Sequence, residues 1–214
     1  MNLWEFILNR YDDLLVAGVE HIWLVGVSVI LCTVIGVGIG VLTYRTDRPR
    51  EIALAVTSTF LTIPSFALFI LLIRPLGIGA PPVLVALTMY GLLPIVRNTI
   101  TGLREVDPAI VESAQGMGLS KTQRLTRIEL PLAWPVIITG VRVATLILVG
   151  VATIGAIVNG PGYGEFIFNG LNRVGSPVAV NLVLSGMLGV IVVAVLFDSV
   201  FNLLGKLTTS RGIR

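Results

Sequence analysis

The sequence has little charge and few of the residue types on which enzymes and secreted domains depend. Only 13% of its 214 residues are charged, whereas a soluble domain carries about 25%. The single cysteine, Cys32, excludes a disulfide framework and a cysteine metal site. The single histidine, His21, has no evident second ligand, and no Ser/His/Asp set stands out. We therefore expect neither a catalytic site nor a bound metal or cofactor.

The sequence also lacks the G-x-x-x-x-G-K-[ST] phosphate loop, so the chain is not itself an ATPase of that class. Its first residues include Glu5, Asp12 and Asp13 and lack the basic start of a cleaved signal peptide. The net charge of +3 does not indicate a nucleic-acid partner, because the basic residues fall in short segments between apolar stretches. What the sequence does have is hydrophobicity, at 55% of residues, which predicts a protein embedded in membrane lipid.

Five apolar stretches approach the length of about 20 residues that a membrane-spanning helix needs. The segment 1–21 is too charged for a sixth span, and its Leu3, Trp4 and Phe6 predict an interfacial helix lying on the membrane. We therefore predict an all-α membrane protein with a single transmembrane domain over residues 1–214. The predicted spans are 22–44, 53–73, 82–96, 134–158 and 178–204.

The distribution of Lys and Arg predicts the orientation, since these residues favour the cytoplasmic side. With the N-terminus outside, only Arg10, Arg74 and Arg173 face outward, and Arg142 lies within the fourth span. The C-terminus and the polar segment 97–131 then lie in the cytoplasm. The basic residues on that side are Arg45, Arg48, Arg50, Arg97, Arg104, Lys121, Arg124, Arg127, Lys206, Arg211 and Arg214.

The polar segment 97–131 carries signals for two short helices. Asp107 followed by Pro108 is typical of a helix start, and the helix is predicted to reach Met117. Gly118 can adopt the positive φ of a tight turn, and Ser120 can cap a second helix. Loop chemistry alone leaves open a hairpin that merely packs on its own membrane domain.

The same segment fits the pattern E-x-A-x-x-x-G-x9-I-x-L-P, and it thereby resembles the cytoplasmic coupling loop of binding-protein-dependent ABC importer permeases. Ser113 stands where the family often has alanine, and it is also small. The resemblance implies that this loop docks on a separate ABC ATPase dimer, which supplies the energy. The residues that match the pattern are Glu112, Ala114, Gly118, Ile128, Leu130 and Pro131.

Further motifs resemble the permeases of osmoprotectant importers, which carry glycine betaine, choline, carnitine or proline betaine. They are L-P-I-V-R-N-T at 93–99, P-L-A-W-P-V-I at 131–137, G-V-R-V-A at 140–144 and G-P-G-Y-G at 160–164. The segment 159–164 departs from the G-A-G-G-L-G usual in that group. Permeases of methionine importers, which share the size and the loop, are the nearest alternative.

This resemblance implies a five-helix core of the methionine-importer-like (type I) ABC permease fold, in a bacterial inner membrane. It also implies an extracytoplasmic substrate-binding protein and a second permease, either a related chain or a second copy. A channel or a non-transport scaffold with a similar loop is the alternative function class, and an ATPase gene and a binding-protein gene beside this one would exclude it.

Four residues within the spans are candidates for further roles. Pro64 interrupts the second span and Tyr90 can face a wet cavity, so both are candidates for lining the passage. Arg142 and Asp198 are predicted at similar depth in antiparallel spans. An unpaired charge at that depth costs about 3 kcal/mol, so we predict that they form an ion pair. Gly26, Gly36, Gly38 and Gly40 in the first span predict close helix packing.

Overall fold

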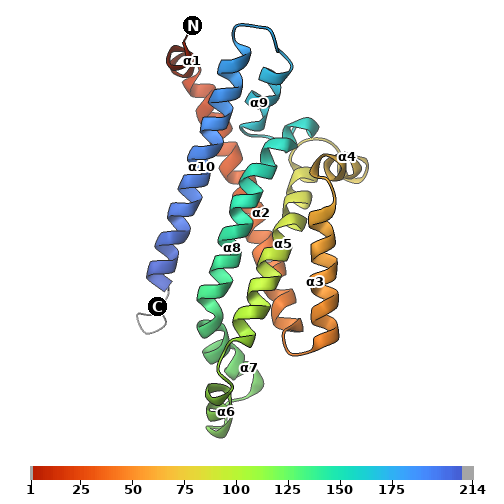
Figure 1. The fold of residues 1–214 in the computed structure, drawn as a ribbon, viewed down its shortest axis with the longest axis vertical. Coiled ribbons are helices and arrows are strands. Elements are labelled where there is room, and N and C mark those ends of the chain that lie inside the picture. Colours follow the sequence, from red (N-terminus) through yellow and green to blue (C-terminus); the bar gives the residue numbers. More distant parts are fainter. Residues whose placement is uncertain (1, 209–214) are drawn as a thin grey trace.

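The computed structural model describes residues 2–208, and every regular element in that range is helical. The main helices run alongside one another, and two short helices project beyond one end of the bundle (Figure 1). The helices are α1 (Leu3–Asn9), α2 (Tyr11–Thr43), α3 (Asp47–Thr62), α4 (Ser65–Leu76), α5 (Ala80–Arg104), α6 (Pro108–Gly116), α7 (Lys121–Arg124), α8 (Leu130–Ala152), α9 (Gly164–Leu171) and α10 (Ala179–Thr208). A π-helical turn, Leu125–Glu129, precedes α8, and a 3-10 turn, Thr153–Val158, follows it.

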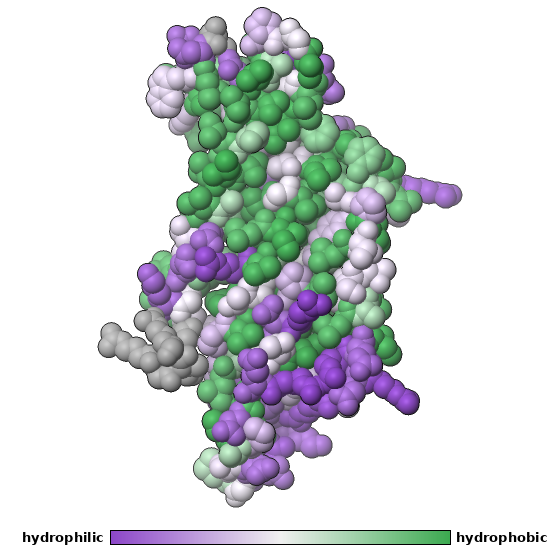
Figure 2. Space-filling model, in the orientation of Figure 1, coloured by the Kyte–Doolittle hydropathy of each residue, from purple (hydrophilic) through white to green (hydrophobic). Residues whose placement is uncertain are grey.

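Four helical stretches of the described chain are long and apolar enough to cross a membrane by themselves: α2, α5, α10 and the continuous run 121–158. The bent pair α3 and α4 brings the number to five if it counts as one span. On the face shown in Figure 2, apolar residues cover most of the bundle, and hydrophilic residues are densest at the lower end. The all-helical membrane fold expected from the sequence is therefore confirmed.

The second predicted span, 53–73, is divided at Pro64, the residue that the sequence indicates as its interruption. α3 and α4 meet at 98°, with Ile63 in an extended conformation between them. Pro64 causes the break, because it has no N–H for a helical hydrogen bond and disfavours a helical residue before it. The hydroxyl of Tyr90 on α5 donates to the Ile63 carbonyl at 2.8 Å, which satisfies a backbone group that has no helical partner at the break.

The N-terminal segment also differs from the prediction. Only α1 is separate, while residues 11–21 continue into the first predicted span as one unbroken α2. Two polar residues at the end of this segment, Glu20 and His21, have partners in the fold. The carboxylate of Glu20 accepts from the Gly162 N–H at 3.2 Å, and His21 Nε2 lies 3.1 Å from the Val149 carbonyl oxygen.

The polar segment is shorter than the predicted 97–131. α5 continues to Arg104, because Thr99, Ile100 and Leu103 are buried against neighbouring helices, and α8 already begins at Leu130. We call residues 108–129, which comprise α6, α7 and the π-helical turn, the polar knob. Arg211 and Arg214, predicted on the cytoplasmic side, lie outside the described residues.

The core is centred on α5, which packs between α2 and α8. Glycines allow the close approach: a Cβ on Gly36 would lie 2.8 Å from Ile95 Cγ2, and one on Gly40 would lie 2.6 Å from Thr99 Cβ. Gly26 and Gly38, by contrast, have open space where a Cβ would be. The packing prediction is therefore confirmed for two of the four glycines of the first span.

Candidate functional site

The first helix of the polar knob begins where its sequence signals place it. The Asp107 carboxylate accepts a hydrogen bond from the Ala109 N–H at 2.8 Å, which caps α6, and Pro108 is the first helical residue. The helix ends with the Leu119 N–H donating to the Ala114 carbonyl at 3.2 Å. Ala114 is buried in this turn, so the small side chain in the motif allows the chain to fold back closely.

The two helices of the knob are joined at Gly118, whose φ is +83°. Only glycine adopts this left-handed conformation at low cost. Two residues later, Ser120 begins α7 with a capping box. Its hydroxyl accepts from the Gln123 N–H at 3.3 Å, and the Gln123 side chain accepts from the Ser120 N–H at 2.8 Å.

The remaining motif residues lie on or near the surface of the knob and the start of α8. Glu112 and Pro131 are exposed, and Ile128 and Leu130 are half-buried. Two apolar side chains that the sequence reasoning missed, Ile110 and Met117, are 43% and 72% exposed. The knob therefore presents two exposed apolar side chains at the hydrophilic end of the molecule.

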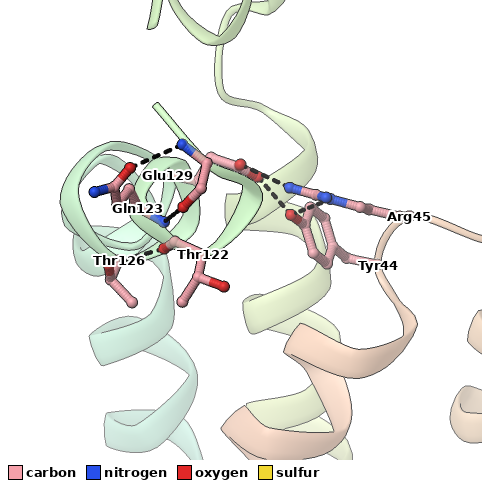
Figure 3. A network of polar contacts seen from close by, with 7 residues as sticks. Tyr44, Arg45, Thr122, Gln123, Thr126 and Glu129 are labelled. Atoms are coloured by element: carbon pink, nitrogen blue, oxygen red, sulfur yellow. Dashed lines mark hydrogen bonds and ion pairs between the residues drawn. The ribbon is translucent and has the colours of Figure 1, made fainter. Parts of the chain in front are cut away.

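Sequence reasoning also missed a polar cluster at the base of the knob. Glu129, the last residue of the π-helical turn, contacts Tyr44 and Arg45, which follow α2 directly (Figure 3). Glu129 occupies an unspecified position of the motif, between Ile128 and Leu130. The sequence contains one sign of this cluster: an acidic residue stands between two apolar motif positions, where a buried carboxylate would need a partner.

The structure brings Arg142 and Asp198 together. Arg142 Nε and Nη2 each lie 2.6 Å from Asp198 Oδ1, which links α8 to α10. Asn202 completes the cluster, because it accepts from Arg142 Nη1 at 2.9 Å and donates to Asp198 Oδ2 at 3.1 Å. The cluster supplies both charged groups with partners inside an otherwise apolar region.

Pro64 and Tyr90, the two candidates for the passage, meet at the break between α3 and α4. Pro64 is exposed there, whereas Tyr90 is buried, with its hydroxyl bonded to the backbone of Ile63. Tyr90 therefore has a structural role, because its hydroxyl binds the backbone at the break between α3 and α4. That either residue lines a passage stays a prediction.

A polar cavity of about 800 Å³ lies at the opposite end from the knob. Its lining includes two carboxylates, Glu20 and Glu165, together with Phe168 and Asn172. No group of three or more metal-ligating side chains occurs among residues 2–208. The arrangement can admit a small polar molecule, but it contains no constellation for covalent chemistry.

Comparison with known proteins agrees with this arrangement. The family model described as "Binding-protein-dependent transport system inner membrane component" matches residues 33–210. The osmoprotectant import permease protein OsmW of Salmonella typhimurium is 36% identical, over all of both chains. The choline transport system permease protein OpuBB of Bacillus subtilis is 34% identical, over 98% of this chain and 95% of its own.

The fold also matches solved structures. An inward-facing structure of the MetNI methionine ABC transporter has a TM-score of 0.82 and 21% identity, and the match covers 92% of this chain and 96% of the other. This likeness establishes the fold that the sequence predicts. Because the family model covers most of the chain and relatives match it from end to end, the protein belongs to the inner-membrane permeases of binding-protein-dependent transport systems.

Proposed function

We propose that this chain is the permease subunit of an ATP-driven importer for an osmoprotectant such as glycine betaine, choline, carnitine or proline betaine. The observation that carries the proposal is the combination of full-length relatives that import these compounds with a knob that exposes apolar side chains. The chain itself acts as a transport subunit, and a partner hydrolyses the ATP.

The polar knob is the part that docks on the ATPase. Its exposed Ile110 and Met117 can enter an apolar groove on that partner, and its basic side chains remain in water. In this orientation the knob and the C-terminus are cytoplasmic and the N-terminus is outside, as the distribution of Lys and Arg predicts. Closure of an ATPase dimer then moves the knob and, through α8, the membrane helices.

The complete importer contains more than one permease. A single five-span bundle with a packed core encloses no passage, so two bundles have to form one between them. We propose a pair related by an approximate two-fold axis, with each copy docked on one ATPase subunit. The second permease is either a related chain or a second copy of this one.

An extracytoplasmic binding protein selects the substrate and delivers it to the outer end of the bundle. The polar cavity of about 800 Å³ beside Glu20 and Glu165 lies at that end. A zwitterion or a quaternary ammonium can cross a site of this kind without a dedicated high-affinity pocket in the permease, since an aromatic cage in the binding protein can supply the affinity.

The substrate is tested by reconstituting the permease with its partner ATPase, binding protein and second permease. Uptake of labelled glycine betaine, choline, carnitine and methionine is measured at equal concentration. We expect accumulation of at least one osmoprotectant and none of methionine. Accumulation of methionine alone would place the chain with methionine importers, and it would refute the proposed substrate class.

A further inference from the structure

The cluster at the base of the polar knob joins two segments that are far apart in the sequence. One Glu129 carboxylate oxygen accepts from the Tyr44 hydroxyl at 2.5 Å, and the other accepts from Arg45 Nη2 at 2.9 Å. Arg45 Nε in turn donates to the Tyr44 hydroxyl oxygen. Because that oxygen accepts from Arg45, its own hydrogen points toward Glu129. The three side chains therefore form a closed ring of hydrogen bonds (Figure 3).

Burial makes this ring more than a surface ion pair. Glu129 is 3% exposed and Tyr44 is 7% exposed. A buried carboxylate is stable only when charged or hydrogen-bonding partners compensate it. Tyr44 also belongs to an apolar cluster with Val96 and Ile100 of α5 and Ile137 of α8. The ring therefore sits where α2, α5 and α8 meet at the cytoplasmic end of the bundle.

The backbone at Glu129 is unusual as well. The turn Leu125–Glu129 is π-helical, and the Leu130 N–H bonds to the Leu125 carbonyl, five residues earlier. A turn of this kind holds one more residue than an α-helical turn, and π-helical turns occur frequently at functional sites. Each residue adds about 100° of rotation along a helix, so this turn fixes the direction in which the knob leaves α8.

We infer that Glu129, Tyr44 and Arg45 form the joint through which movement of the polar knob reaches α2, with Glu129 as its positioning residue. The inference rests on the proposed docking of the knob on an ATPase. α8 follows the knob because the chain is continuous. α2 packs against α5 and α8 along the bundle, and these hydrogen bonds tie its end directly to the base of the knob. Loss of the joint releases the end of α2 from the knob, so ATP is hydrolysed without the full helix movement that admits substrate.

The experiment compares Tyr44→Phe and Glu129→Ala with the native complex in proteoliposomes. Uptake of labelled glycine betaine and ATP hydrolysis stimulated by the loaded binding protein are measured in the same vesicles. We expect the uptake per ATP to fall roughly tenfold in each variant, as lost hydrogen bonds to a charged group imply. Stimulated ATP hydrolysis should stay within about twofold of native. The double variant should be no worse than Glu129→Ala, because both changes break one ring.

Tyr11→Phe provides the matched control. It makes the same chemical change as Tyr44→Phe, but at the opposite end of α2, where Tyr11 is exposed. Uptake per ATP should be unchanged in this variant. The mild Tyr44→Phe change keeps the test valid if Glu129→Ala assembles poorly, because it removes only a hydroxyl.

Two results would overturn the inference. One is native uptake per ATP in Tyr44→Phe. The other is an equal fall in uptake and hydrolysis, which would show that the ring only stabilises the docking surface. A native complex that takes up glycine betaine without any stimulated ATP hydrolysis would instead contradict the proposed function, so the two failures are distinguishable.

Discussion

Replacing Gly118 by valine is expected to reduce ATP-driven uptake to less than a tenth of the native rate while the helical bundle still inserts into the membrane. The φ of +83° at Gly118 costs about 1–2 kcal/mol for an ordinary L-residue, and a β-branched residue is a strong outlier there. Nothing lies within 4 Å of a Cβ at this position, so the conflict is with the backbone and not with neighbours. The turn must therefore open and change the angle between α6 and α7.

The measurement is uptake together with ATP hydrolysis stimulated by the loaded binding protein, at matched expression. Both should fall, because a reoriented α6 no longer docks. Gly116→Val is the matched control, since a Cβ at Gly116 also meets open space but the residue lies at the end of α6 in a helical conformation. Native uptake in Gly118→Val, or an equal loss in both variants, would contradict the role of this turn.

Removing either member of the Arg142–Asp198 pair is expected to lower the amount of assembled complex several-fold. Each variant leaves one charge inside an apolar region, at about 3 kcal/mol for an isolated charge in a spanning helix. The remaining member would keep only Asn202 as a hydrogen-bond partner within the cluster. The link between α8 and α10 therefore loosens in both single variants.

Detergent-resistant assembly and uptake are measured for Arg142→Ala, Asp198→Ala and the double variant. The double variant should be no worse than the worse single variant, because it strands no charge. Arg173→Ala serves as a control, since that arginine is exposed between α9 and α10. Losses that simply add in the double variant would show that the two side chains act independently.

The sequence predicted those parts of the fold that depend on local signals. Asp107, Gly118 and Ser120 act on the backbone within a few residues, so the helices of the polar knob lie where the sequence places them. The long apolar stretches likewise predict the helices that can span a membrane. The contact between Arg142 and Asp198 was predictable because an unpaired charge within a membrane span is energetically unfavourable.

The parts that escaped prediction depend on distant partners. Pro64 was recognised as an interruption, but the sharp break also uses the hydroxyl of Tyr90, 27 residues from the Ile63 carbonyl that it satisfies. Glu129 meets Tyr44 across 85 residues, and the π-helical turn that orients it has no short-range signature. Local patterns cannot reveal groups that tertiary packing brings together.

ATP-dependent accumulation in sealed vesicles tests the central claim most directly. Proteoliposomes with the full complex, the loaded binding protein on the outside and ATP available to the cytoplasmic face are compared with vesicles that contain a catalytically inactive ATPase. The account predicts that the osmoprotectant taken up in the substrate test accumulates above its external concentration only with ATP and an active ATPase, and that Gly118→Val abolishes this accumulation. Equilibration of the substrate at the same rate without ATP would contradict it and would identify the protein as a channel.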